Sequence, residues 1–128
     1  AAVHALAYPI GGTFHISHGL SNSLVLPYVL RFNSVDVKAA KNYAELAPYV
    51  FPKLDINKGT QAVCAEFIDK LEDLSKRLGL PQKLREVDIP KDACEKMASD
   101  AMKQTRLLVN NPREVTEVDA LNIYQSAW

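Results

Sequence analysis

Apolar residues recur with the spacing of α-helices along nearly all of this 128-residue chain, and no stretch alternates apolar and polar residues as a β-strand does. The clearest helix is predicted over residues 58–78, where charged residues occupy the face opposite an apolar stripe. That stripe comprises Val63, Phe67, Leu71, Leu74 and Leu78. Gly79 and Pro81 follow it and predict where the helix ends. The pattern therefore favours an all-α fold.

Helix-ending and helix-capping residues divide the rest of the chain into further helices. We predict them over residues 1–8, 18–32, 36–49, 91–108 and 116–128, with a turn at 83–86. Thr116 and Asp119 form a variant of the capping box at the start of the last helix. In the helix over 91–108, the residues expected to face inward are Cys94, Met97, Ala98, Ala101, Thr105 and Leu108. Together these elements predict one all-α domain of six or seven helices.

Composition and net charge indicate which kinds of binding partner this chain lacks a reason to have. An apolar content of 48% is enough for a core, while Lys plus Arg and Asp plus Glu each number 15. The net charge of zero gives no electrostatic reason to expect nucleic acid or an anionic membrane as a partner. The longest apolar run, residues 24–30, is too short to span a bilayer. Cys64 and Cys94 lie in apolar helical patterns, which favours buried, reduced thiols over a disulfide or a metal site and fits a cytoplasmic protein.

All the histidines of the chain, His4, His15 and His18, fall within its first 18 residues. We expect Pro9 and the glycine pair 11–12 to end the first helix and to fold His4 back towards His18. Because a helix starting at His18 would disfavour a charged imidazolium there, this ring would stay in the neutral form that binds metal. On spacing alone, His4 and His18 are either metal ligands or ordinary structural histidines. Two imidazoles also leave a coordination shell incomplete.

Three separated motifs carry a resemblance to a known family. Residues 4–33, HALAYPIGGTFHISHGLSNSLVLPYVLRFN, resemble the signature of the iron-dependent (group III) alcohol dehydrogenases. Residues 78–84, LGLPQKL, are similar to the Gly-Leu-Pro turn of that family. Residues 110–128, NNPREVTEVDALNIYQSAW, are similar to its ending. The resemblance covers all 128 residues in the family's order.

The resemblance implies a two-domain enzyme in which residues 1–128 form the C-terminal all-helical, metal-binding domain. A dinucleotide-binding domain, which holds NAD or NADP, would precede it and is absent from this sequence. His4 and His18 fall on two of the family's four metal-ligand positions, and the missing sequence would supply the other two, an Asp and a His. The implied metal is Fe(II), with Zn(II) as the alternative because it binds similar ligands.

Two residues near the implied ligands are candidates for a catalytic role. Tyr8 replaces a histidine that many family members carry four residues after the first ligand. A phenol, with a reference pKa of about 10, is a poor base at neutral pH, although it can donate a hydrogen bond or relay a proton. His15 matches no ligand position, and we expect it either in the cleft, helping to position substrate or relay protons, or in a loop at the cleft edge. Residues 107–109 are expected either to line the pocket or to pack in the core.

The implied reaction is the interconversion of a primary alcohol and its aldehyde, with a metal ion as Lewis acid and the nicotinamide as hydride acceptor. The chain alone is expected to be inactive, and the full-length protein to form a homodimer or a higher homo-oligomer in the cytoplasm. Two alternatives remain open. One is a related glycerol dehydrogenase-like or maleylacetate reductase-like oxidoreductase, and the other is a non-catalytic helical interaction module.

Overall fold

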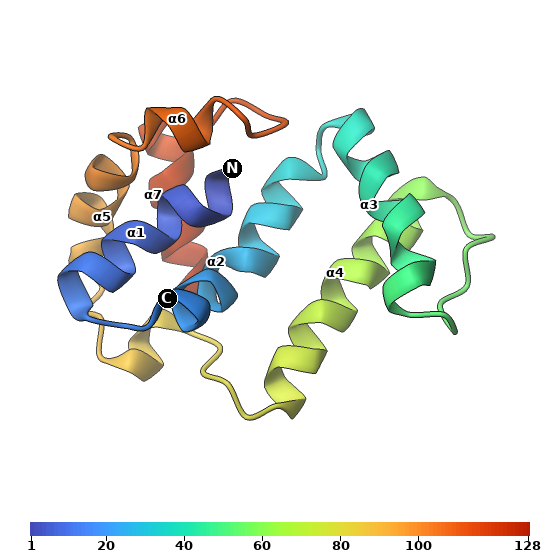
Figure 1. Cartoon of the computed structure of the whole chain (residues 1–128), viewed down its shortest axis with the longest axis horizontal. Coiled ribbons are helices and arrows are strands. Elements are labelled where there is room, and N and C mark those ends of the chain that lie inside the picture. Colours follow the sequence, from blue (N-terminus) through green and yellow to red (C-terminus); the bar gives the residue numbers. More distant parts are fainter.

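The computed structural model describes all 128 residues and contains seven α-helices, one 3-10 helix and no strand (Figure 1). In chain order the elements are α1 (Ala2–Phe14), α2 (His18–Asn33), α3 (Val37–Val50), α4 (Thr60–Arg77), η1 (Leu84–Val87), α5 (Ala93–Ala101), α6 (Thr105–Leu108) and α7 (Glu117–Ala127). The all-α class and the number of helices predicted from the apolar pattern are therefore confirmed. No helix combines the length and the apolar character that crossing a membrane would require.

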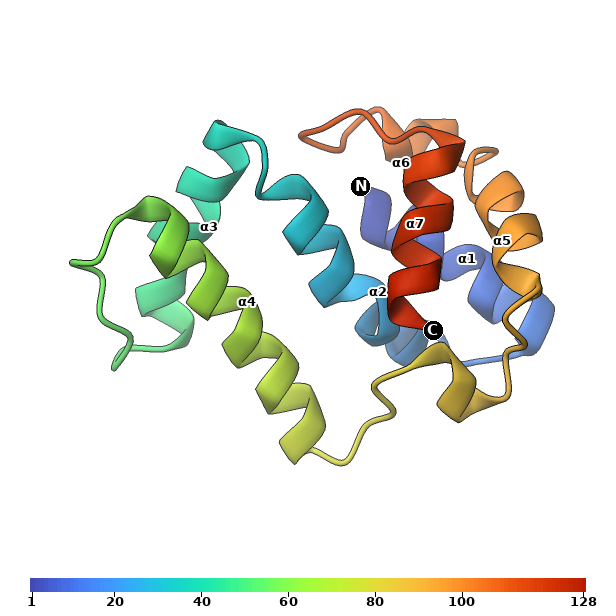
Figure 2. The same cartoon turned by 180° about the vertical axis from the view of Figure 1, so that it is seen from behind.

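Most of the chain packs around one core, in a region that we call the body and that consists of α1, α2, η1, α5, α6 and α7. Its core is a cluster of 18 buried residues. Helix α7 lies between α2 and α5 and packs against both (Figure 2). The buried Tyr124 hydroxyl of α7 donates a hydrogen bond of 2.6 Å to the backbone carbonyl of Leu6 in α1. Burial raises the pKa of Tyr124, so this hydroxyl stays a donor over the whole physiological range.

The remaining two helices, α3 and α4, form a second region that we call the arm, residues 37–77. Figure 1 shows the arm lying to one side of the body, on the far side of α2. Its interior consists of two small buried clusters of four and three residues. Arg31 of α2 connects body and arm through ion pairs with Asp69, at 3.1 Å, and with Glu72, both on α4.

The first helix is longer than predicted. We expected it to end at Tyr8, but α1 continues through Pro9 and the two glycines to Phe14. Proline removes one hydrogen bond within a helix and strains it, yet Leu6 and Ile10 on the inner face of α1 are fully buried in the body, and this packing holds the helix together. The helix ends at His15, which adopts the left-handed conformation with φ of 57°. The chain therefore reverses at residues 15–17 rather than at the Pro-Ile-Gly-Gly segment.

The predicted helix over residues 91–108 is also wrong in one respect, because it is broken into α5 and α6. Backbone hydrogen bonds tighten to a three-residue spacing at Lys103 and Gln104. The break redirects the chain so that Leu107 and Leu108 pack against the core of the body, whereas Thr105 is exposed. The inward positions predicted within α5 are confirmed, since all four residues, Cys94, Met97, Ala98 and Ala101, are buried.

Several predicted helix ends are confirmed at the level of individual hydrogen bonds. The Thr116 hydroxyl accepts from the Asp119 backbone N–H at 3.2 Å, and the Asp119 carboxylate accepts from the Thr116 backbone N–H at 2.9 Å. Gly79 adopts φ of 77° after α4, and the bond from the Leu80 N–H to the carbonyl of Ser75 completes a Schellman motif. Cys64 and Cys94 are buried and unpaired, as predicted, and burial raises the pKa of each thiol.

Candidate metal-binding site

Three aromatic side chains from α1 and α2 gather on the surface of the body. His4 and Tyr8 lie one turn apart on α1, and His18 is the first residue of α2. The ring centroids of His4 and His18 are 5.3 Å apart with a 45° angle between the planes. The centroids of Tyr8 and His18 are 6.0 Å apart with an angle of 38°. All three residues are exposed, so the group is open to a partner or ligand outside this chain.

A close return of the chain brings His18 beside α1. A Cβ atom placed on Gly11 would lie only 3.1 Å from the carbonyl oxygen of Ile16, which shows how tightly residues 15–17 pass along α1. The buried Ser21 hydroxyl then donates to the carbonyl of Ser17 at 2.8 Å and ties the first turn of α2 together. Ser17 occupies the predicted N-cap position, but its side chain makes no capping hydrogen bond. Gly11 thus permits the close approach expected of a glycine here, although it does not make the turn.

The spacing of the two imidazoles fits a shared metal ion. Metal–nitrogen bonds of about 2.0–2.1 Å in a tetrahedral site place two imidazole ring centres about 5 Å apart. The observed 5.3 Å between His4 and His18 agrees with that separation. No group of three or more His, Cys, Asp or Glu side chains comes together in the chain to complete such a site. The two histidines can therefore supply half of a four-ligand shell, on a face open to further ligands.

Asn22 is a neighbour of His18 that sequence reasoning missed. Its amide nitrogen lies 3.1 Å from Nε2 of His18, one helical turn earlier on α2. The amide oxygen of Asn22 is buried and is the single buried side-chain oxygen or nitrogen in the chain without a hydrogen-bond partner. The i, i+4 spacing of the two residues was the available signal, because side chains four apart on a helix lie on one face.

The structure does not bring His15 into this group. His15 lies at the end of α1, where its backbone N–H donates to the carbonyl of Gly11 at 3.0 Å. Its side chain is exposed and makes no ring contact with His4, Tyr8 or His18. Its expected place in or at the edge of a cleft, and its role there, stay predictions.

Residues 107–109 were expected either to pack in the core or to line a pocket, and the structure shows both environments. Leu107 and Leu108 are half-buried against the core of the body. Val109 is 78% exposed and, with Leu108, borders an open groove of about 410 Å³. The neighbouring Asn111 lies close to the start of α1, because its side-chain oxygen accepts from the Ala2 N–H at 3.3 Å.

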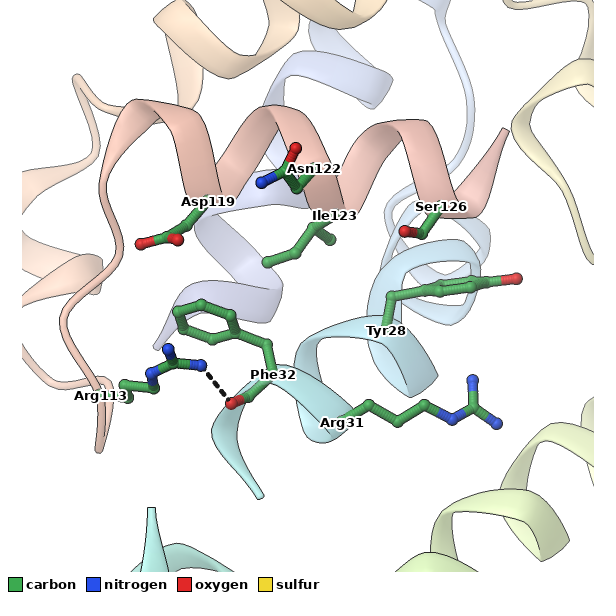
Figure 3. A pocket seen from close by; sticks show the side chains of 8 residues that line it. All are labelled: Tyr28, Arg31, Phe32, Arg113, Asp119, Asn122, Ile123 and Ser126. Carbon is green, nitrogen blue, oxygen red and sulfur yellow. Dashed lines mark hydrogen bonds between the residues drawn. The ribbon is translucent and has the colours of Figure 1, made fainter. Parts of the chain in front are cut away.

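A larger groove, of about 490 Å³, lies between α2 and α7 and does not include the histidines (Figure 3). Its lining residues are Tyr28, Arg31, Phe32, Arg113, Asp119, Asn122, Ile123 and Ser126. The Arg113 guanidinium stacks on the Phe32 ring at 3.9 Å and donates to the Phe32 carbonyl at 2.9 Å. Arg31 is paired with the carboxylates of α4. Both cations therefore have structural partners within the chain.

Comparison with known proteins shows which family has this sequence and this fold. The family model described as "Fe-containing alcohol dehydrogenase family, C-terminal" matches residues 1–128. The long-chain-alcohol dehydrogenase 1 of Geobacillus thermodenitrificans is 37% identical over 131 residues, which cover 100% of this chain and 32% of that protein. The lactaldehyde reductase of Escherichia coli is 30% identical over 126 residues, which cover 98% of this chain and 32% of that protein. Among solved structures, a 1,3-propanediol oxidoreductase superposes with a TM-score of 0.90 at 28% identity, over 100% of this chain and 32% of that one.

The fold and the matching family model thus define the helical C-terminal domain of a class of oxidoreductases. The chain belongs to the Fe-containing alcohol dehydrogenase family and corresponds to its C-terminal domain. It spans about a third of the length of the relatives it matches. The family that the three sequence motifs indicated is therefore confirmed.

Proposed function

We propose that residues 1–128 are the C-terminal, metal-binding domain of a larger alcohol dehydrogenase that interconverts a primary alcohol and its aldehyde with NAD or NADP. The observation that carries the proposal is the pairing of His4 and His18, whose ring centroids are 5.3 Å apart on an open surface. The relatives' names support the class of substrate, since they include alcohol dehydrogenases and a lactaldehyde reductase. A dinucleotide-binding domain outside these residues would hold the nicotinamide.

The proposed metal is Fe(II), or Zn(II) in its place, because imidazole with carboxylate suits both ions. His4 and His18 would each bind through one ring nitrogen. An Asp and a His from a preceding segment of the longer protein would complete the four ligands, since this chain gathers no third ligand beside them. When bound, the ion supplies Lewis acidity that polarises the oxygen of the alcohol or aldehyde.

The other proposed site residues act on the substrate rather than on the metal. The Tyr8 ring lies 6.0 Å from that of His18, so its hydroxyl is available to hydrogen-bond the substrate or to relay a proton. We propose that His15, which is also exposed, positions substrate or relays protons at the edge of the cleft. We further propose a cytoplasmic location, which the two buried, unpaired cysteines support, and a homo-oligomeric full-length protein.

The test compares the full-length protein with the 128-residue chain. The full-length protein, loaded with Fe(II), should reduce NAD or NADP in the presence of a primary alcohol, measured as nicotinamide absorbance. The chain alone should show no turnover, because it lacks the dinucleotide site and half of the proposed metal ligands. Turnover by the chain alone would contradict the proposal that a separate domain binds the dinucleotide and supplies the other metal ligands.

The alternative, a non-catalytic helical interaction module, differs from the dehydrogenase in the sequence that we expect before residue 1. If the chain is part of a dehydrogenase, the segment before it should carry an Asp and a His four residues apart on a helix, after a Gly-rich nucleotide-binding region. Sequencing the parent open reading frame decides the matter. An upstream region without those features would favour the module.

A further inference from the structure

Asn111 caps the first turn of α1 from a distant part of the chain. The first N–H groups of a helix have no carbonyl partner within that helix. Ala1, which precedes α1, makes no side-chain hydrogen bond to them. Instead, Oδ1 of Asn111 accepts from the Ala2 N–H at 3.3 Å, across 109 positions of sequence. Asn111 therefore does for α1 what a capping side chain does in other helices.

The amide of Asn111 can take only one orientation, because backbone groups contact both of its ends. A backbone N–H can only donate, and a backbone carbonyl can only accept. Oδ1 faces the Ala2 N–H, whereas Nδ2 donates to the carbonyl of Arg113 at 2.7 Å. Turning the amide over would set donor against donor at one contact and acceptor against acceptor at the other. The structure therefore fixes this side chain.

Asn33, the last residue of α2, pairs with this amide. Nδ2 of Asn111 donates to Oδ1 of Asn33 at 2.8 Å, and Nδ2 of Asn33 donates back to Oδ1 of Asn111 at 3.2 Å. Asn33 is 3% exposed, so water competes little for the pair. The two asparagines belong to separate family-like motifs, residues 4–33 and 110–128, and metal binding by the histidines explains neither of them.

The asparagine pair joins the two helices that carry the paired histidines. Residues 15–17 connect the end of α1 to the start of α2 covalently. The asparagine pair connects the start of α1 to the end of α2 by hydrogen bonds. His4 lies two residues after Ala2, in the turn that Asn111 caps, and His18 is the first residue of α2. The position of His4 relative to α2 therefore depends on Asn111.

We propose that Asn111 is a positioning residue for His4: by capping α1 and pairing with Asn33, it sets the separation of the His4 and His18 imidazoles. Two ligands of one ion must be held to within about 0.5 Å of the productive geometry. The inference rests on the proposed function, because it assumes that the two histidines bind one ion. Direct partners of metal-ligating histidines commonly change metal affinity by about 10–100-fold when they are lost. Asn111 acts one step farther away, through the helix, so its loss should have a smaller effect.

The test compares the full-length protein with its variant Asn111→Ala. Zn(II) affinity, measured by competition with a chelator, should fall by about threefold to tenfold. The absorption spectrum of the Co(II)-loaded protein should change as well, because it reports the geometry of the ligands. Asn110→Ala is the matched control, since this exposed neighbour donates only to the carbonyl of Arg106. It should leave both the affinity and the spectrum unchanged.

Two further variants separate position from stability. Asn33→Ala reaches His4 only through Asn111, so Zn(II) affinity should fall by less than in Asn111→Ala. The double variant should bind Zn(II) no more weakly than Asn111→Ala, because the two residues act as one unit. Leu54→Ala removes buried side-chain atoms from the arm, away from the asparagine pair, and should leave Zn(II) affinity unchanged.

The results distinguish the inference from the proposed function. Zn(II) binding that survives His4→Ala would overturn the proposed function. Zn(II) binding that requires His4 but is unchanged in a folded Asn111→Ala would overturn the inference alone. Where Asn111→Ala does not fold, an unchanged affinity in Asn33→Ala has the same meaning. Equal losses in Asn111→Ala and Leu54→Ala would also overturn the inference, since affinity would then follow stability.

Discussion

The body and the arm of this domain are built from similar helices but differ in how they are stabilised. The body buries 18 residues in one continuous cluster, to which α1, α2, α5 and α7 all contribute. The arm buries seven residues in two separate clusters and attaches to the body through α2. It also carries six of the twelve large apolar side chains that are exposed: Val37, Leu46, Tyr49, Val50, Ile56 and Leu74. The arm is therefore the less self-sufficient region.

The paired histidines belong to the body. His4 is on α1, which the Tyr124 hydroxyl of α7 holds through the Leu6 carbonyl, and His18 begins α2. Helices with a fully buried face keep their relative position more firmly than helices at the edge of a fold. We therefore expect the geometry of the His4–His18 pair to depend on the core of the body and to be insensitive to small changes in the arm.

Truncating one buried leucine to alanine in each region tests whether body and arm really differ in stability. Leu24 in the body and Leu54 in the arm are both buried, at 1% and 5% exposure. Leu24→Ala should reduce the free energy of unfolding by about 3–5 kcal/mol, while Leu54→Ala should cost about 2 kcal/mol, because the small cluster around Leu54 can collapse onto the gap. Hydrogen exchange of the full-length protein, resolved by segment, measures both changes.

The two regions should also respond differently in that experiment. Leu54→Ala should accelerate exchange in α3 and α4 only and leave Zn(II) affinity unchanged. Leu24→Ala should accelerate exchange across the body, including α1. If Leu54→Ala loosened α1 as much as Leu24→Ala does, body and arm would be one cooperative unit and the comparison would fail.

Smaller changes in stability and in Zn(II) affinity are expected from alanine substitutions at the two neighbouring glycines of α1. A Cβ at Gly12 meets nothing within 4 Å, so Gly12→Ala should stabilise the helix by about 0.5–1 kcal/mol. Gly11→Ala gains the same helix propensity but brings its Cβ to 3.1 Å from the Ile16 carbonyl. The connection to His18 must then shift, so Zn(II) affinity should fall, by less than about tenfold because both proposed ligands remain. Equal behaviour of the two variants in thermal melting and in metal affinity would show that the close return of the chain is unimportant.

Local signals in the sequence were sufficient for most of the helices and several of their ends. The apolar stripe of α4, the Gly79 terminus and the pair Thr116 and Asp119 each depend on interactions within a few residues, so spacing alone reveals them. The family assignment also followed from three short motifs in order, and the family model confirms it over the whole chain.

Features that depend on tertiary packing were not predictable in the same way. Pro9 normally ends a helix, but α1 continues past it because its inner face, including Leu6 and Ile10, is buried in the body. The break between α5 and α6 has no glycine or proline to mark it and results from the packing of Leu107 and Leu108 on the core. The contact of Asn22 with His18 was visible only as a spacing, and no third His, Cys, Asp or Glu side chain joins His4 and His18 in this chain.

The central claim is that His4 and His18 together bind one metal ion, and metal content tests it most directly. Elemental analysis of the purified full-length protein should give one metal per chain, and His4→Ala and His18→Ala should each lose it. His15→Ala, a matched change at the histidine outside the pair, should retain it. Retention of a full equivalent of metal in either His4→Ala or His18→Ala would contradict the claim.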